Sequence, residues 1–297
     1  MPVVAVDSQM GVARTIKALR ARVDAWRSAG LTVGLVPTMG ALHDGHLSLI
    51  RQANVHAQRT VASIFVNPAQ FAPHEDLAAY PRQEGADLEM LQKAGCHLAF
   101  IPTPEEMYPD GFQTSVRVSD LAEGLCGNSR PHFFGGVATV VAKLLNQVRP
   151  DIAVFGEKDY QQLLVIRRMV KDLNMSVDII GAPILREADG LAMSSRNAYL
   201  TADGRAIAGR LNGVIEAMAG KLSAGIAAES VLAEGRAAID AAGFDRLDYL
   251  EVRSADLLEP QGPGPITRSS RVFVAAIVGK TRLIDNWPAG LPAAGTG

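Results

Sequence analysis

Residues 31–46 read Leu-Thr-Val-Gly-Leu-Val-Pro-Thr-Met-Gly-Ala-Leu-His-Asp-Gly-His, and this stretch limits the possible folds more than any other. Its first six residues are mostly apolar and predict a buried strand, which Pro37 and Gly40 end. A helical pattern of apolar residues then starts at His46. A strand, a glycine-bearing loop and a helix N-terminus together direct N–H groups and the positive end of the helix dipole to one place. Such a place suits a phosphate group.

His43 and His46 are three positions apart, so their imidazoles share a face if the first helical turn includes His43. Two hydrogen-bond donors beside a phosphate can bind the charge that develops during attack on phosphorus. A zinc pair on a helix has i, i+4 spacing, and the glutamate of His-Glu-x-x-His is absent. Two unrelated surface histidines are the other alternative. The flanking strand and glycines favour a nucleotide-phosphate site.

The composition is that of an ordinary soluble globular protein, with 297 residues, 48% of them hydrophobic and 20% charged. A net charge of −2 provides no overall field that would attract nucleic acid or a membrane, so neither is expected as a partner. Cys96 and Cys126 lack metal-type spacing and are expected to be reduced thiols of unassigned role. No signal peptide or membrane-spanning run is recognisable, and a cytoplasmic location is expected.

Predicted strands and helices alternate along the first part of the chain, which indicates an α/β fold with a Rossmann-like doubly wound parallel sheet. Strands are expected at residues 31–36, 60–66, 97–101, 152–155 and 177–180, and helices at residues 12–29, 46–58, 83–94, 137–148 and 160–173. Ligands bind such sheets at the carboxyl ends of the strands. His43, Asn67 and Lys158 each follow a predicted strand end, so they are expected to form one site.

Composition changes after Leu185. This change predicts a nucleotide-binding catalytic domain of residues 1–185 and a smaller C-terminal α+β domain of residues 186–297 that acts as a lid, with Gly190 as a candidate hinge. Helices are expected at residues 203–221 and 227–242, strands at 247–252, 271–278 and 282–285, loops at 73–81, 116–130 and 259–270, and a frayed end at 288–297.

Four segments stand in a specific order along the chain: Pro37–His46, Ser63–Gln70, Val154–Gln162 and Arg186–Asn197. Together they resemble the pantothenate synthetase (pantoate–β-alanine ligase) family of the nucleotidyltransferase superfamily, over about residues 12–287. His43–His46 matches the His-x-Gly-His element, and Met193–Arg196 matches the Lys-Met-Ser-Lys-Ser-like loop. One segment departs from the family pattern, because His132 stands one place early and Phe133 replaces the usual histidine.

The resemblance implies a homodimer that condenses pantoate with β-alanine through a pantoyl adenylate, with ATP as a substrate and magnesium as a cofactor. The products are pantothenate, which is a coenzyme A precursor, together with AMP and pyrophosphate. The implied catalytic residues are His43, His46, Lys158, Ser194, Ser195 and Arg196. The implied ATP-binding residues are Met39, Gly40, Ala41, Leu42, His43, Asp44, Gly45, His46, Gly156, Glu157, Lys158, Asp159, Leu185, Met193, Ser194, Ser195 and Arg196. Gln70 and Gln162 are implied to bind substrate, as amides that both donate and accept.

The residue types suit these roles. His46 is expected to supply a proton or a hydrogen bond to the departing pyrophosphate, because histidine titrates near neutrality. Lys158 offers a point charge to phosphate unless it pairs with a neighbouring carboxylate, and Arg196 can clamp polyphosphate through two hydrogen bonds unless it forms an ordinary ion pair. Asp87 is a candidate magnesium ligand, although a helix aspartate is usually just solvated.

Two other functions stay open from the sequence. A nucleotidyl transferase with a dinucleotide-like product shares the histidines and the serine–arginine loop, but it gives no reason for both Gln70 and Gln162. A non-catalytic nucleotide-binding module would not need His43, His46 and Lys158 together.

Overall fold

The computed structural model describes residues 10–71, 77 and 80–291, and the chain forms two compact units. The first unit comprises residues 1–122, 130–157 and 165–183, and the second comprises residues 123–129, 158–164 and 184–297. The main division therefore falls between residues 183 and 184, and two short earlier segments belong to the second unit. Much of the loop expected at residues 73–81 lies outside the described residues.

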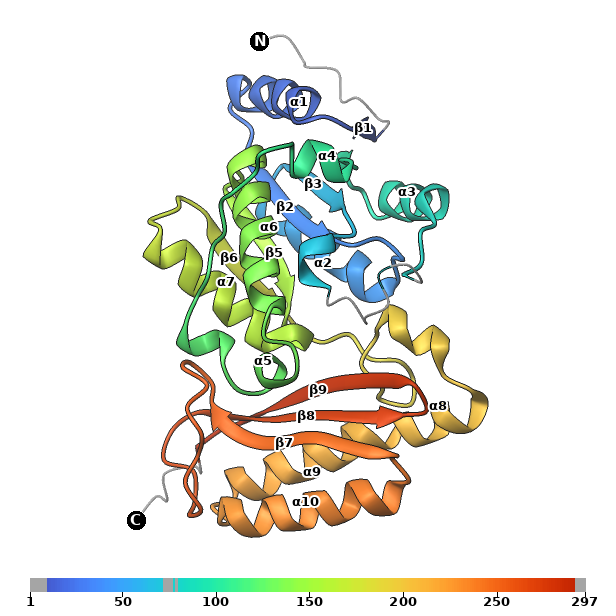
Figure 1. Cartoon of the computed structure of the whole chain (residues 1–297), viewed down its shortest axis with the longest axis vertical. Helices are drawn as coiled ribbons and strands as arrows, with labels where there is room; N and C mark the ends of the chain where they lie inside the picture. The colour runs from blue at the N-terminus through green and yellow to red at the C-terminus, as the bar shows by residue number, and fades with distance from the viewer. Residues whose placement is uncertain (1–9, 72–76, 78–79, 292–297) are drawn as a thin grey trace. The chain divides into compact units, whose positions relative to one another are not determined.

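The first unit contains a six-stranded, all-parallel sheet in the order β1-β4-β3-β2-β5-β6, which confirms the predicted fold class (Figure 1). Its strands are β1 (Gly11–Ala13), β2 (Val33–Thr38), β3 (Arg59–Ile64), β4 (Leu98–Phe100), β5 (Ile152–Gly156) and β6 (Asp178–Ala182). The chain runs from β2 to β3 on one side and later returns with β5 on the other side of β2. The loop after β2 therefore lies at the switch point of the sheet, where α/β folds bind ligands.

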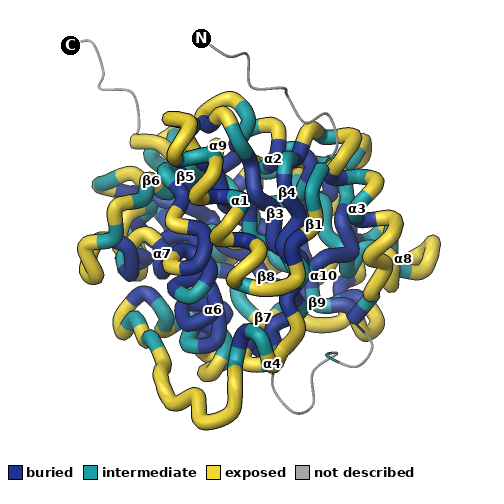
Figure 2. Tube along the Cα trace, turned by 90° about the horizontal axis from the view of Figure 1, so that it is seen from above, coloured by how far each residue is buried: buried dark blue, intermediate teal, exposed yellow. Residues whose placement is uncertain are grey.

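Helices cover this sheet. They are α1 (Ile16–Ser28), α2 (Asp44–His56), η1 (Pro68–Gln70), α3 (Glu84–Lys93), α4 (Pro104–Met107), η2 (Asp120–Ala122), α6 (Phe133–Val148) and α7 (Tyr160–Asp172), whose first turn belongs to the second unit. Alternate strand residues such as Val36 and Ala62 form one buried cluster with Ile50 of α2 and Leu91 of α3. The nearly continuous apolar sequence of α6 is buried along most of its length, and its tube is mostly dark blue in Figure 2.

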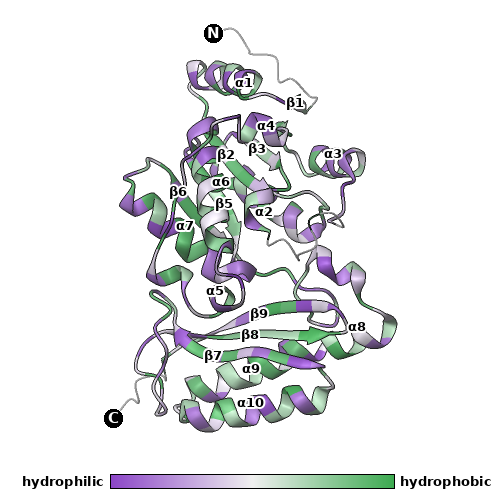
Figure 3. Cartoon of the chain, in the orientation of Figure 1, coloured by the Kyte–Doolittle hydropathy of each residue, from purple (hydrophilic) through white to green (hydrophobic). Residues whose placement is uncertain are grey.

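The second unit contains a three-stranded antiparallel sheet in the order β7-β8-β9. Its strands are β7 (Arg246–Ser254), β8 (Ser270–Val278) and β9 (Thr281–Ala289), and its helices are α5 (Cys126–Ser129), η3 (Glu157–Asp159), η4 (Ser195–Tyr199), α8 (Ala202–Ala208), α9 (Arg210–Ser223) and α10 (Ala228–Ala242). The first residue of η3, Glu157, still belongs to the first unit. Leu211 and Ile215 of α9 share a core with Leu250 of β7 and Val272 of β8. Figure 3 shows β8 in green along most of its length, as expected for its apolar sequence.

Several element boundaries differ from those expected. The helix expected at residues 203–221 is two helices that meet at Gly209, where a Cβ would lie 2.9 Å from Asp189 Oδ2. β9 continues to Ala289, so residues 288 and 289 are strand and not frayed. β1 lies partly within the range expected for the first helix, because three residues pair with β4. Among the described residues, no helix is both long and apolar enough to cross a bilayer.

Candidate active site

The two histidines of the loop–helix segment lie together at the N-terminus of α2. His43 caps the helix, and its Nδ1 accepts a hydrogen bond from the Gly45 N–H at 3.1 Å. The ring centroids of His43 and His46 are 4.1 Å apart, so the two imidazoles share the first turn. Because Nδ1 of His43 is an acceptor, the proton of the neutral ring lies on Nε2. His43 can thus offer an Nε2–H donor to a ligand.

A buried carboxylate holds the loop that precedes α2. Asp87, which is 1% exposed, accepts the Ala41 N–H on Oδ2 at 3.0 Å and the Leu42 N–H on Oδ1 at 2.9 Å. Gly40 and Ala41 have φ values of +78° and +50°, and a Cβ on Gly40 would lie 2.9 Å from Asp87 Oδ2. Glycine at position 40 therefore satisfies both the backbone conformation and the close approach of the carboxylate.

This arrangement bears on two expectations. The sequence suggested that the loop N–H groups face a phosphate, but two of them bind the protein's own carboxylate. Asp87 was a candidate magnesium ligand, whereas both of its oxygens already accept backbone donors in a buried position. This geometry favours a bracing role for Asp87. Within the described part of the chain, no group of three His, Cys, Asp or Glu side chains is placed to hold a metal.

Gln70 lies in η1, just after β3, and is 8% exposed. Its Oε1 accepts a hydrogen bond from Asn67 Nδ2 at 3.1 Å, and its Nε2 lies 2.9 Å from Met39 Sδ. The N-terminal part of α6 packs against this turn, and a Cβ on Gly136 would lie 2.3 Å from the Ala69 carbonyl oxygen. Only glycine at position 136 permits this approach. The contact between Gln70 and Met39 places the turn next to the loop after β2.

In the second unit, side chains of the sheet hold the backbone of Lys158. The Lys158 carbonyl accepts a hydrogen bond from Asn286 Nδ2 at 3.0 Å, and Asn286 Oδ1 accepts one from Arg271 Nη1 at 2.9 Å. The Arg271 guanidinium lies 4.0 Å from the centroid of the Tyr160 ring. Sequence reasoning gave Arg271 and Asn286 no role. The signal for them in β9 was a pair of adjacent polar residues, Asp285 and Asn286, between the apolar Ile284 and Trp287.

The segment that contains the serine–arginine motif is also braced. Arg186 forms two hydrogen bonds with Asp285, of 2.7 and 3.0 Å, and pairs with Ala192 in a short β-bridge. Gly190, with φ +87°, lies in the tight turn between these two residues. It is therefore a turn residue, and the structure gives no support to its expected hinge role.

The serine–arginine motif itself caps η4. Ser194 Oγ accepts a hydrogen bond from the Arg196 N–H at 3.3 Å. Met193, Ser194, Ser195 and Arg196 are all half-buried. Gln162 is half-buried in the first turn of α7, next to Gln161, whose amide binds the backbone of Glu123, Gly124 and Cys126.

The expected site residues are thus divided between the units. The first unit contains the loop from Met39 to Gly45 with both histidines, Gln70, Asp87, Gly156 and Glu157, and the second contains Lys158, Asp159, Gln162, Leu185, Met193, Ser194, Ser195 and Arg196. Phe133, which replaces the usual histidine of the family, is the first residue of α6, and the Arg130 guanidinium lies 3.9 Å from its ring centroid.

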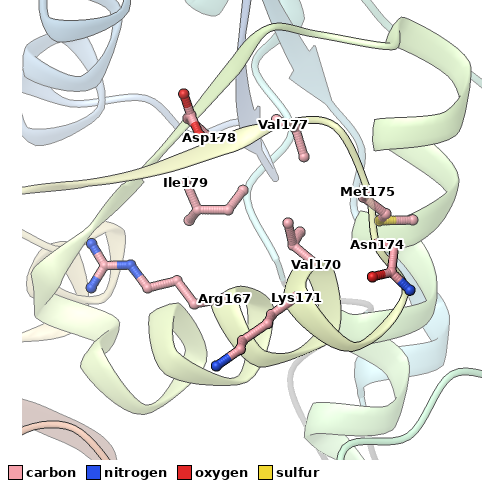
Figure 4. Close-up of a pocket in the computed structure, with 8 residues that line it drawn as sticks. All are labelled: Arg167, Val170, Lys171, Asn174, Met175, Val177, Asp178 and Ile179. Carbon is pink, nitrogen blue, oxygen red and sulfur yellow. The ribbon is translucent and has the colours of Figure 1, made fainter.

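An open pocket of about 520 Å³ lies between α7 and β6 (Figure 4). Aliphatic side chains form part of its lining, and Arg167 and Lys171 of α7 and Asp178 of β6 give it charge. None of the expected site residues lines this pocket.

Comparison with known proteins identifies relatives over nearly the whole chain. Residues 11–288 match the pantoate-beta-alanine ligase family. The chain is 56% identical to the pantothenate synthetase of Caulobacter vibrioides over 94% of its own length and 98% of the relative, and 54% identical to that of Maricaulis maris over 97% and 100%. The solved pantothenate synthetase of Thermus thermophilus superposes with a TM-score of 0.88 at 44% identity, covering 95% of this chain and all of that one.

A further solved relative carries ligands. It is the pantoate-beta-alanine ligase of Francisella tularensis, complexed with beta-gamma ATP and beta-alanine. This structure has a TM-score of 0.80 and 34% identity, and the match covers 95% of this chain and 98% of that chain.

Proposed function

This chain belongs to the pantoate–β-alanine ligase family, and from that premise we propose how its residues carry out the reaction. The chain is an ATP-dependent ligase that joins pantoate to β-alanine. The observation that carries this conclusion is the 56% identity to a pantothenate synthetase over 94% of the chain. The ligands of the Francisella tularensis enzyme support ATP and β-alanine as substrates.

The reaction proceeds in two steps. A pantoate carboxylate oxygen attacks the α-phosphorus of ATP, so that one P–O bond forms while the bond to pyrophosphate breaks. The β-alanine amine then attacks the acyl carbon of the pantoyl adenylate, AMP leaves, and the nitrogen loses its surplus proton. Charge on the phosphate oxygens increases in the first step, so catalysis is mainly positioning and electrostatic stabilisation. Excluding water protects the adenylate between the two steps.

His43 and His46 stabilise the first step from the N-terminus of α2. The capping bond from Gly45 places the proton of the neutral His43 ring on Nε2, the atom that donates to a phosphate oxygen in this proposal. His46, whose ring centroid is 4.1 Å from that of His43, is the proton or hydrogen-bond donor to the departing pyrophosphate. The positive end of the helix dipole adds to the attraction for the phosphates.

The second unit supplies cations and hydroxyls to ATP. Lys158 acts as a point charge on the phosphates, with its backbone held by Asn286. Ser194, Ser195 and Arg196 complete the nucleotide site, and Arg196 clamps the polyphosphate. In this proposal residues 186–297 act as a lid on the nucleotide-binding domain and exclude water from the adenylate.

Gln70 and Gln162 bind pantoate, whose hydroxyls and carboxylate suit amide groups. Magnesium would enter bound to ATP and reduce the charge on its phosphates. We do not assign Asp87 as its ligand, because both Asp87 oxygens already accept backbone N–H groups. We place the reaction in the cytoplasm, which suits an ATP substrate and the two free thiols, Cys96 and Cys126.

We also propose that the protein is a homodimer. In the described part of the chain, β6 is an edge strand with partly exposed Ile179 and Ile180, a surface on which a second copy can pair. Sedimentation equilibrium should give twice the monomer mass of 31.5 kDa. A single species of 31.5 kDa at micromolar concentration would contradict the dimer.

The function is tested by AMP release from ATP and pantoate, with and without β-alanine. We expect steady release only with all three substrates, and positional isotope exchange in ATP when β-alanine is omitted. Steady AMP release into a dinucleotide-like product would favour a nucleotidyl transferase. Nucleotide binding without any turnover would favour a binding module.

His46 is tested by His46→Ala. Loss of a group that binds charge only as the adenylate forms should lower kcat by about 100-fold or more. The melting temperature should change little, because His46 lies at the helix N-terminus and outside the core. Normal adenylate formation in a single turnover would remove His46 from the mechanism.

A further inference from the structure

Tyr108 is a half-buried side chain that none of the proposed steps uses. It follows α4, and its hydroxyl donates a hydrogen bond to Asn67 Oδ1 at 2.8 Å. Burial raises the pKa of Tyr108 to about 12, so the phenol stays protonated and can donate throughout the physiological pH range. The ring of Phe65 lies beside that of Tyr108 in a tilted arrangement, with centroids 6.2 Å apart, and the ring of Phe112 lies edge-on at 5.2 Å.

Asn67, the acceptor of this bond, has only one possible amide orientation. Its Oδ1 also accepts the Ala69 N–H at 3.3 Å, and its Nδ2 donates to the Gly136 carbonyl at 3.2 Å. A backbone N–H can only donate and a carbonyl can only accept, so these two contacts assign oxygen and nitrogen of the amide. The Tyr108 bond is the shortest of those to Asn67.

The orientation of Asn67 determines what Gln70 can offer a ligand. Asn67 Nδ2 donates to Gln70 Oε1 at 3.1 Å, so the Gln70 oxygen faces Asn67. The Gln70 Nε2 therefore faces the loop after β2, where Met39 Sδ, a weak acceptor, lies 2.9 Å away. The second N–H of this amide can donate to a ligand. The hydrogen bond from Asn67 Nδ2 to the Gly136 carbonyl ties this turn to α6.

We propose that Tyr108 is a positioning residue that acts through Asn67 and, together with the backbone contacts of Asn67, holds Gln70 as a dedicated hydrogen-bond donor to a substrate oxygen. The chemical group recognised is a hydroxyl or carboxylate oxygen that accepts. This inference rests on the proposed binding of pantoate by Gln70. A Gln70 amide free to rotate could offer either of its ends, whereas this one selects acceptors.

The test is steady-state kinetics of Tyr108→Phe, which removes one hydroxyl and keeps the ring. We expect the KM for pantoate to rise about 5- to 10-fold, as for the loss of one hydrogen bond in a network. The KM values for ATP and β-alanine and the kcat should stay within about twofold of wild type. A matched control is Phe112→Leu, which removes the neighbouring ring and keeps the hydroxyl. It should lower the melting temperature without changing the KM for pantoate.

The decisive comparison is the double variant Tyr108→Phe/Gln70→Ala. If Tyr108 acts through Gln70, its effect on the pantoate KM should disappear in the Gln70→Ala background, since residues in one network are not additive. An equal rise in KM in both backgrounds would overturn the proposal, as would a pantoate KM unchanged by Tyr108→Phe alone. A wild-type enzyme that releases no AMP with pantoate and β-alanine would instead refute the proposed function.

Discussion

Each unit contains a buried aspartate that holds candidate site residues in place, but the two use different partners. Asp87 in the first unit is 1% exposed and binds the neutral N–H groups of Ala41 and Leu42. Asp285 in the second unit is 3% exposed and binds the guanidinium of Arg186 at 2.7 and 3.0 Å. One carboxylate determines the course of a backbone loop, and the other anchors a charged side chain.

The difference predicts unequal tolerance to substitution. The loop held by Asp87 has two positive-φ residues in succession, and its two N–H groups require acceptors. Arg186 has further contacts, because it also donates to the Gly190 carbonyl at 3.1 Å and lies 4.8 Å from the Trp287 ring centroid. We therefore expect substitution of Asp87 to abolish most of the enzyme's activity and substitution of Asp285 to lower it only in part.

The largest effect is expected for Asp87→Asn. The amide keeps the shape of the carboxylate but has one oxygen, so its NH2 group must face one of the two loop N–H groups. Leaving one buried donor unsatisfied costs about 1–3 kcal/mol of stability. The displaced loop also carries His43 and His46, and adenylate formation in a single turnover should fall by about 100-fold.

Magnesium titration separates bracing from metal binding in this variant. If Asp87 braces the loop, excess magnesium should not restore adenylate formation by Asp87→Asn. Restoration at high magnesium would identify Asp87 as a metal ligand after all. The control is Asp172→Asn, an exposed aspartate paired with Arg168 one turn earlier on α7, which should change neither activity nor stability.

Local sequence signals were sufficient for the strand–loop–helix segment and for the parallel sheet. The apolar run, Gly40 and the histidine spacing all lie within residues 31–46. The strand end expected at Pro37 was wrong, because β2 pairs with β3 through Pro37 and Thr38. The partner of the loop could not be found this way, because Asp87 is 46 positions from Ala41 and reads as an ordinary helix aspartate. The same holds for Gly136, whose contact with Ala69 joins two segments that no local pattern relates.

A smaller effect is expected for Asp285→Asn in the second unit. Asparagine can still accept one hydrogen bond from Arg186, whose side chain is 17% exposed and so keeps some solvent access. In our proposal this pair supports the segment that leads to Arg196, so ATP affinity measured by calorimetry should fall about 10-fold or less. Pantoate binding should be unchanged.

The control for Asp285→Asn is Glu234→Gln, which breaks a half-exposed surface pair with Lys221 in the same unit. Surface pairs contribute about 0–1 kcal/mol, so this variant should bind ATP as wild type does. If Asp285→Asn disabled adenylation as severely as Asp87→Asn, the distinction between the two carboxylates would be wrong.

The smallest expected effect is on the pH dependence of stability. It too differs between the units, because all six histidines lie in residue ranges of the first unit. His97 Nδ1 accepts the Thr60 N–H at 3.1 Å, which requires an unprotonated nitrogen. Burial, with a contribution from Arg59, lowers the pKa of His97 below its ordinary value of 6.5. The unfolded chain therefore binds a proton near pH 6.5 that the folded chain does not, so stability is present above this pH and decreases as the pH falls.

Thermal melting between about pH 7.5 and 5 tests this sign. His97→Asn keeps an acceptor for the Thr60 N–H but does not titrate, so its melting temperature should decrease less over this range than that of the wild type. Since the second unit contains no histidine, the difference should arise in the first unit and leave hydrogen-exchange protection of β8 unchanged. If the melting temperatures of the wild type and His97→Asn fell in parallel with pH, His97 would not link stability to pH. The two units would then differ mainly in how Asp87 and Asp285 hold their partners.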